Sequence, residues 1–322
     1  MHGRWRSDAT RSRLGLVVAV LVLPVLVFGG TIGGFWQGVK AEDGPMPEVV
    51  RATVLGTEGI NVRSCPSLRC EVLVAVKLGE TVVVTGATVD GFSPVDYGGV
   101  QGFAYDLYLM KENGAPPVLL EGDPGCKRIA LIFNIGIGEP PILGILDDLE
   151  ERDVPATVFL MGWWAEAYPD EVERIAEQGF VIGSHGDQRH ELTSLGDAQI
   201  AQDVADADAA ITEALEGERP SPWFTAYAAA SDNRTRGIVA RSGYLPVEWR
   251  VPAADFGPGA TAKSVYSRVM PRVYDGAIVE FHLDGPASAT STGVALPWIV
   301  DELRDKGYEF VTIPDMADPC EE

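Results

Sequence analysis

The most constraining feature of this sequence is an alternation of short apolar runs with longer segments of helical spacing, which begins after Lys127. Strands that alternate with helices predict a parallel sheet, because the chain must cross back before each new strand. We therefore expect an α/β fold, a (β/α) barrel of fewer than eight units, with its site at the C-terminal ends of the strands. The expected strands are 128–133, 156–160, 180–183, 244–247, 277–281 and 309–313, and the expected helices are 142–152, 170–178, 198–215 and 298–306.

A second region, 50–111, has a different pattern and predicts a small all-β domain. Its runs are short and rich in β-branched residues, as in Thr81-Val-Val-Val-Thr85, and glycines separate them at close intervals. Short strands bounded by turn residues are typical of a small β-barrel or sandwich. Proline and glycine are dense in 112–125, which we expect to be a linker to the α/β domain, 126–322.

The first 45 residues predict a segment that inserts into a membrane. Arginines at positions 4, 6, 11 and 13 precede an apolar run, 14–36, that contains no charged residue. Such a run is long enough to span a bilayer, and the arginines keep its start in the cytoplasm. A small-residue pattern at 39–41 leaves two interpretations open, a cleaved signal peptide or an uncleaved signal anchor. Both predict that the rest of the chain is extracytoplasmic, either secreted or membrane-anchored.

The formal net charge is −22. This charge argues against nucleic acid as a partner, because phosphate binding needs a basic surface. It is compatible with an exported domain that binds neutral or cationic ligands.

The four cysteines fit an exported chain. An even number of cysteines outside the cytoplasm indicates disulfides, and four cysteines allow three pairings. We favour Cys65–Cys70 and Cys126–Cys320, because the second pair would join the two ends of one domain. Four free thiols remain the alternative.

Several short motifs in 50–111 carry a family likeness: Gly59-Ile-Asn-Val-Arg63, Cys65-Pro-Ser67, Gly79-Glu-Thr81 and Gly102-Phe-Ala-Tyr105. Together they resemble the bacterial SH3-type (SH3b) domain. The resemblance implies recognition of cell-wall peptides or a spacer role. The aromatic residues of the segment either form a binding groove or fill its small core: Phe92, Tyr97, Phe103, Tyr105 and Tyr108.

A second likeness spans about 127–313. It rests on Ala156-Thr-Val-Phe159, Gly162-Trp-Trp-Ala-Glu-Ala-Tyr-Pro169, Ile182-Gly-Ser-His185, Leu192-Thr-Ser-Leu195, Ile278-Val-Glu-Phe-His282 and Leu303-Arg-Asp-Lys-Gly-Tyr-Glu-Phe-Val-Thr312. These segments resemble the polysaccharide deacetylase (NodB-homology, carbohydrate esterase 4) family. The resemblance implies a distorted (β/α) barrel of the polysaccharide deacetylase type that removes acetyl groups from N-acetylglucosamine-type polymers with a divalent metal.

The family's chemistry defines which residues matter. A divalent metal lowers the pKa of its bound water and polarises the amide carbonyl. A carboxylate takes the proton from that water, and a histidine later donates a proton to the leaving amine. The family uses one aspartate and two histidines as ligands, and the preceding aspartate as the base.

The first motif of the family is altered in this sequence. Where the family has Thr-Phe-Asp-Asp-Gly, the chain has Ile132-Phe-Asn-Ile-Gly136. Asn134 occupies the position of the base, and an amide cannot accept a proton at neutral pH. Ile135 occupies the position of the carboxylate ligand and has no lone pair to offer. The resemblance therefore implies that both functions are lost.

The second motif keeps one of its two histidines. His185 is retained as a metal ligand, but Arg189 stands where the second ligand belongs, and His190 lies one residue later. The third motif reads Thr225-Ala-Tyr227 and lacks its arginine.

The last two motifs are better kept. Trp249 and Asp255 match the fourth motif, and His282 matches the fifth, but Glu280 replaces an apolar residue. His282 and Asp255 are thus the catalytic positions that remain.

Glu280 and Arg189 suggest a replacement for the metal. Glu280 and His282 alternate along one strand and so face the same side, toward the mouth of the barrel. A buried carboxylate needs a partner. Our hypothesis is that Arg189 supplies a cation in the place of the metal and pairs with Glu280. The alternative is a solvated Glu280 with Arg189 pointing outward.

A rearranged metal site is a further alternative. His185, His190, Glu280 and His282 have side chains that could bind a zinc-type divalent metal, and Asp187 or Glu139 could then act as the base. Otherwise no cofactor is expected.

Three functions follow from these observations. The first is an impaired deacetylase homologue that binds cell-wall polysaccharide or peptidoglycan, with Tyr227, Trp249 and Trp164 as sugar-stacking surfaces. The second is an active polysaccharide N-deacetylase with a rearranged site. The third is a structural envelope protein that its SH3b-like domain targets to the wall.

Overall fold

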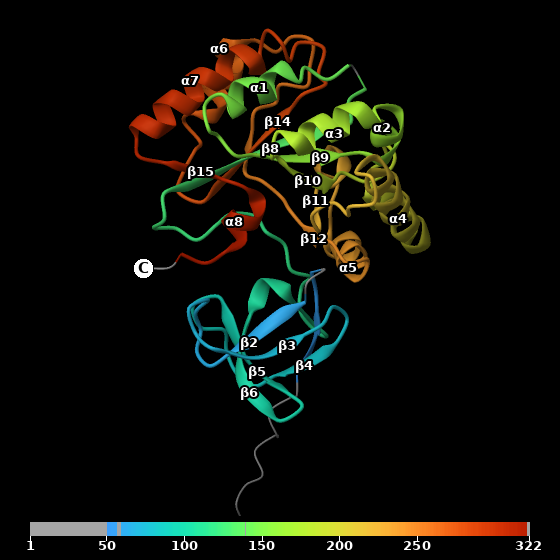
Figure 1. Cartoon of the computed structure of the whole chain (residues 1–322), viewed down its shortest axis with the longest axis vertical. Helices are drawn as coiled ribbons and strands as arrows, with labels where there is room; N and C mark the ends of the chain where they lie inside the picture. Colours follow the sequence, from blue (N-terminus) through green and yellow to red (C-terminus); the bar gives the residue numbers. More distant parts are fainter. Residues whose placement is uncertain (1–49, 57–58, 139, 321–322) are drawn as a thin grey trace, which may run out of the picture. The chain divides into compact units, whose positions relative to one another are not determined.

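The computed structural model describes residues 50–56, 59–138 and 140–320 (Figure 1). The predicted signal peptide or anchor, with its apolar run 14–36, lies outside these residues. No helix within the described ranges has both the length and the apolar composition that a membrane span needs.

Residues 50–111 form an antiparallel sheet, as the pattern of short β-branched runs predicts. The strand order is β3-β2-β6-β5-β4-β1-β7. Apolar side chains from alternate positions, such as Ala52, Val62 and Val82, are fully buried in a core of their own. The strands are β1 (Val50–Val54), β2 (Ile60–Arg63), β3 (Val72–Val76), β4 (Thr81–Val84), β5 (Phe92–Tyr97), β6 (Val100–Tyr105) and β7 (Leu109–Lys111).

The α/β region is built on a parallel sheet, which confirms the prediction from the alternating pattern. Its order is β12-β11-β10-β9-β8-β14-β13, and β15 also pairs with β8. The order has two ends and no pairing that joins them in the described residues, so the barrel is open. The strands are β8 (Arg128–Ile135), β9 (Thr157–Leu160), β10 (Val181–Ser184), β11 (Trp223–Phe224), β12 (Leu245–Pro246), β13 (Val251–Pro252), β14 (Ala277–His282) and β15 (Glu309–Val311).

The helices of this region include the four predicted segments and others that the pattern did not reveal. They are α1 (Gly144–Glu150), α2 (Gly162–Ala167), α3 (Pro169–Glu177), α4 (Asp197–Ala214), α5 (Asn233–Arg241), α6 (Ala262–Val269), α7 (Thr292–Asp305) and α8 (Ile313–Ala317). Helix α7 begins before the predicted start at 298 because Pro297 lies inside the helix rather than at its boundary.

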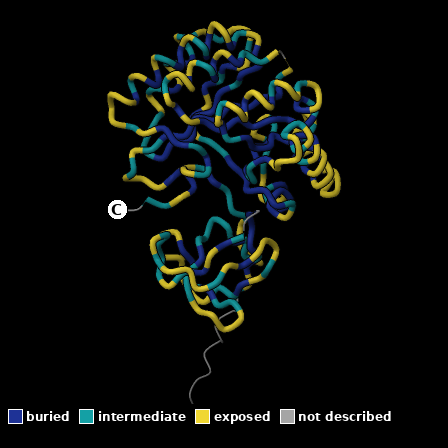
Figure 2. Tube along the Cα trace, viewed as in Figure 1, coloured by how far each residue is buried: buried dark blue, intermediate teal, exposed yellow. Residues whose placement is uncertain are grey.

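Side chains on the two faces of the central strand β8 pack into two different apolar cores. Successive side chains of a strand point to opposite faces. Ile129, Leu131, Phe133 and Ile135 join the core that contains side chains of α1, α3 and α7. Ala130 and Ile132 join the other core. Figure 2 shows the buried strands at the centre of this region, with exposed residues on the helices around them.

The predicted linker is partly ordered against the sheet. Leu119 is buried and forms a parallel bridge with Val247, just after β12. Its N–H donates to the Pro246 carbonyl over 2.9 Å. The segment 112–125 therefore includes a residue that extends the edge of the α/β sheet.

Both predicted disulfides are confirmed. Cys65–Cys70 closes a short loop, with a sequence separation of 5 residues. Cys126–Cys320 joins the two ends of the α/β region across 194 residues.

Candidate functional site

A cavity of about 410 Å³ lies at the C-terminal ends of the parallel strands, where the sequence predicts the site. Its size suits a small ligand. The polar residues that line it come from the ends of three strands: Asn134 from β8, His185 after β10, and Glu280 and His282 from β14. Tyr227, Trp249 and Phe256 contribute aromatic surface.

Strand register explains why these polar groups converge. In the parallel pairing of β8 with β14, His282 lies opposite Asn134, and Glu280 lies opposite Ile132. Glu280 and His282 share a face of β14, as predicted, and their neighbours Val279 and Phe281 point into the helix-covered core. The sheet thus places a carboxylate, an imidazole and an amide side by side.

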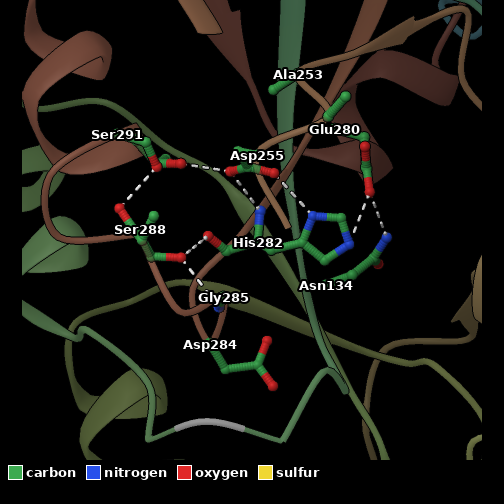
Figure 3. A network of polar contacts seen from close by, with 12 residues as sticks. Asn134, Ala253, Asp255, Glu280, His282, Asp284, Gly285, Ser288 and Ser291 are labelled. Atoms are coloured by element: carbon green, nitrogen blue, oxygen red, sulfur yellow. Dashed lines mark hydrogen bonds and ion pairs between the residues drawn. The ribbon is translucent and has the colours of Figure 1, made fainter. Parts of the chain in front are cut away.

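His282 is held between two carboxylates (Figure 3). Its Nδ1 lies 2.9 Å from Oδ1 of Asp255, and its Nε2 lies 3.1 Å from Oε1 of Glu280. Asp255 is fully buried, and its Oδ2 also accepts the His282 backbone N–H over 3.1 Å. The Thr292 hydroxyl donates to the same oxygen. These contacts fix the orientation of the imidazole ring.

The two carboxylates change how His282 titrates. Burial alone lowers the pKa of His282, but the charges of Glu280 and Asp255 outweigh burial and raise this pKa to about 9. Burial raises the pKa of Glu280 to about 7, although the His282 charge opposes this shift. The pair therefore shares protons across the neutral pH range.

A second chain of contacts links Asn134 to His185 through Thr225. The Thr225 hydroxyl donates to Oδ1 of Asn134 over 3.0 Å, and Nδ1 of His185 lies 2.8 Å from the same hydroxyl. Nδ2 of Asn134 reaches Oε1 of Glu280 at 3.5 Å, a long contact. Burial lowers the pKa of His185 to about 3, so its ring is neutral. Thr225 was predicted only as the site of a missing arginine; here it joins the two sides of the network.

Ile135 does not face the cavity. Its side chain is fully buried in the helix-covered core with Phe133 and Leu160. A hydrocarbon side chain offers no lone pair to a metal. The position that the resemblance assigns to a carboxylate ligand is therefore part of the apolar core.

The predicted ion pair between Arg189 and Glu280 is wrong. Arg189 is exposed, its Nη1 donates to the Ile137 carbonyl over 2.7 Å, and its guanidinium lies 5.3 Å from the centre of the Trp163 ring. Buried Asp203 accepts the backbone N–H groups of Asp187 and Gln188 at 3.0 and 3.1 Å. These hydrogen bonds fix the path of the loop before Arg189. Glu280 contacts His282 and not Arg189.

The alternative metal ligands do not assemble. His190 is exposed, and neither it nor Asp187 lines the cavity. Glu139 lies outside the described residues. Within the described ranges, no group of three or more His, Cys, Asp or Glu side chains is placed to hold a metal ion. The donor set of the cavity therefore does not fit the divalent metal that the resemblance implies.

Two of the three predicted sugar-stacking residues line the cavity. Tyr227 lies 6.0 Å from His185 between ring centres, and Trp249 is half-buried at the cavity wall. The prediction that Trp164 stacks on a sugar is wrong, because its side chain is 0% exposed and packs in the helix-covered core. The exposed Phe256 takes its place: its ring is 5.6 Å from His282. The sequence signal that could have identified Phe256 as a cavity residue was its position next to Asp255.

Asp284 is a buried carboxylate that the sequence analysis missed. Its Oδ2 accepts the backbone N–H groups of Gly136 and Gly138 at 3.0 and 2.8 Å. It therefore fixes the turn that follows β8 at the edge of the cavity. Burial raises the pKa of Asp284. Its position two residues after His282, at a strand end, was the available signal.

Three alanines near the cavity have left-handed backbone conformations. Ala228 and Ala229 line the cavity with φ of 56° and 53°, and Ala254, beside Asp255, has φ of 51°. Such conformations cost about 1–3 kcal/mol each and cluster at functional sites. The strain at these positions supports the cavity as a functional site.

Comparison with known proteins finds a polysaccharide deacetylase match in the sequence and the same fold among solved structures. A family profile described as polysaccharide deacetylase matches residues 121–247. The peptidoglycan-N-acetylglucosamine deacetylase of Bacillus cereus is 28% identical over 195 residues, which are 61% of this chain and 70% of that protein. The matched profile includes Asn134, Ile135, His185 and Arg189 but ends before Asp255, Glu280 and His282.

Solved structures show the same fold. The peptidoglycan deacetylase PdaC from Bacillus subtilis aligns with a TM-score of 0.51 at 26% identity, over 60% of this chain and 91% of that one. A carbohydrate esterase 4 family pseudoenzyme from Bacillus anthracis aligns with a TM-score of 0.58 at 23% identity, over 66% of this chain and 76% of that one.

Proposed function

Because the chain carries a polysaccharide deacetylase domain, we propose that it is an impaired homologue that binds cell-wall polysaccharide without efficient deacetylation. The observation that carries the proposal is the position of Ile135, buried in the apolar core where the family has a carboxylate ligand. No neighbouring residue supplies the missing ligand or the base. Arg189 and His190 are exposed, and Asn134 cannot act as a base.

The missing groups would act together in the reaction. Removing one general acid, base or charge-stabilising group costs factors of about a hundred to a thousand or more. Here the base and two of three ligand positions are replaced in the same motifs, so little activity is expected to remain. His282 with Asp255 keeps an acid group in place, but no step can use it without an activated water.

The cavity itself supports binding. It retains the volume and the aromatic surface that a sugar ring needs, on Tyr227, Trp249 and Phe256. Relatives that act on peptidoglycan make a cell-wall glycan the natural ligand class for this chain.

The remaining regions fit a place in the cell envelope. We propose that the antiparallel sheet of 50–111 is an SH3b-like domain that contacts the wall, and that 14–36 is a signal peptide or anchor. Two disulfides suit an oxidising compartment.

Sedimentation of the full chain with purified peptidoglycan and with chitin tests this function. We expect binding to at least one of the polymers, and Phe256→Ala should weaken it about fivefold, because roughly 1 kcal/mol of stacking is lost. Trp298→Ala removes an aromatic residue that is similarly exposed on α7 and outside the cavity lining, and should bind as the wild type does. Equal weakening by both variants, or no sedimentation with either polymer, would contradict the proposal.

A further inference from the structure

The charges around the cavity are not balanced. His282 contacts the carboxylates of both Asp255 and Glu280. One imidazole can carry at most one positive charge, so this group of three keeps one excess negative charge when both carboxylates are ionised. No lysine or arginine is among the described residues that line the cavity. A ligand with a single positive charge would therefore complete the balance.

Glu280 is placed to meet such a ligand. It is only 4% exposed and lines the cavity, so water does not screen it well. Both of its side-chain contacts within the described ranges use Oε1, one with His282 and one with Asn134. Its Oε2 has no donor among these residues, and it is not one of their fully buried side-chain atoms that lack a partner. The oxygen is therefore open to the cavity, where a ligand can donate a hydrogen bond to it.

The surrounding surface favours a cation on a ring-shaped ligand. Trp249, Tyr227 and Phe256 present aromatic rings around the same cavity. Aromatic faces attract cations and also pack against apolar faces of rings. An ammonium group offers three hydrogen-bond donors and a full charge, whereas an acetamido group offers one neutral N–H.

We propose that this cavity binds the protonated amine of a de-N-acetylated amino sugar, a glucosamine-type residue, with Glu280 as its acceptor. The inference rests on the proposed glycan binding and names its ligand class. The protein would then recognise wall polysaccharide from which acetyl groups have already been removed. The reaction class that must precede its binding is amide hydrolysis on the polymer.

Calorimetric titration of the full chain with two oligosaccharides tests the inference. One is an oligomer of β-linked glucosamine, and the other is the N-acetylated oligomer of the same length, both at neutral pH. We expect the glucosamine oligomer to bind at least about tenfold more tightly. Glu280→Gln keeps the shape and should remove most of this preference. Glu173→Gln removes a carboxylate from the exposed part of α3, outside the cavity, and controls for general attraction to an acidic protein.

The outcomes separate the two proposals. Equal or tighter binding of the N-acetylated oligomer overturns this inference and leaves glycan binding intact. A preference that Glu173→Gln reduces as much as Glu280→Gln also overturns it. The absence of binding by either oligomer overturns both proposals. The wild-type ratio alone decides the question if Glu280→Gln fails to fold.

Discussion

Glu280 and His282 lie on one face of β14, with Oε1 of the glutamate 3.1 Å from Nε2 of the imidazole. Asp255 holds the other ring nitrogen. This pairing lies in the cavity at the C-terminal ends of the strands, and it makes the site a network of protein groups. Arg189, which was predicted from the sequence to pair with Glu280, takes no part in it.

The pairing predicts a pH dependence of stability above neutral pH. The folded pKa of His282, about 9, exceeds the value of 6.5 for a free histidine. The stabilisation is therefore complete below about pH 6.5 and is lost as the pH rises through about 9. The shift corresponds to roughly 3 kcal/mol at most. His185 changes its protonation near pH 3 and Glu280 near pH 7, so the range from about pH 8 upward isolates His282.

Denaturant unfolding at a series of pH values from about pH 8 upward measures this slope. Glu280→Gln removes the charge that raises the pKa of His282, and should flatten the slope. Wild-type stability that stays constant or rises over the same range would show that His282 is not held as a cation between the two carboxylates.

We predict that the Trp164 side chain stabilises the folded protein. The side chain is fully buried, so Trp164→Ala should cost roughly 3–5 kcal/mol in unfolding free energy. Its neighbour Trp163 is half-buried and contacts Arg189, and Trp163→Ala should cost less than half as much. Denaturant unfolding compares the two. If Trp164→Ala were as stable as the wild type but lost glycan binding, the earlier assignment of Trp164 to sugar stacking would be right after all.

The Cys126–Cys320 disulfide should contribute more to stability than Cys65–Cys70. A cross-link restricts the unfolded chain more when it closes a longer loop, and the sequence separations are 194 and 5 residues. The chain-entropy argument gives a difference of about 3 kcal/mol. Serine replacement of each pair, followed by thermal and denaturant unfolding, measures it. Equal losses from the two pairs would contradict this argument.

The fold was largely predictable from the sequence, because it follows from periodicity. Apolar runs such as 128–133 and 277–281 became β8 and β14, since buried parallel strands need continuous apolar side chains. Helices α5 and α6 were missed. Their N-terminal caps use Thr235 and Ser264 at the third helical position, where the usual signal is a glutamate or glutamine.

The site was predictable only in part. Strand alternation correctly put Glu280 beside His282, because both lie on one element. The partner of Arg189 could not be predicted, since it depends on the loop that Asp203 anchors from α4. Asp284 was missed for a similar reason: its partners are backbone N–H groups of a turn, which leave no mark in the sequence.

Restoring the family's residues tests the alignment of the motifs. The combined change Asn134→Asp, Ile135→Asp and Arg189→His restores the residue types of one base and two ligands. It should raise zinc affinity by at least about a hundredfold, because a charged carboxylate at position 135 is too costly to keep in the apolar core and would turn toward the cavity. Ile135→Asp alone serves as the control, because it carries the cost of a buried charge without completing the ligand set. Unchanged zinc affinity in a folded triple variant would show that these positions do not correspond to the family's metal site.

We predict that the wild-type cavity does not support metal-dependent deacetylation. Zinc and cobalt titration of the full chain, with acetate release from an N-acetylated oligosaccharide followed in the same samples, measures it most directly. We predict metal affinity weaker than micromolar and no acetate above the rate without protein. Micromolar or tighter binding of either metal together with acetate release would contradict the account.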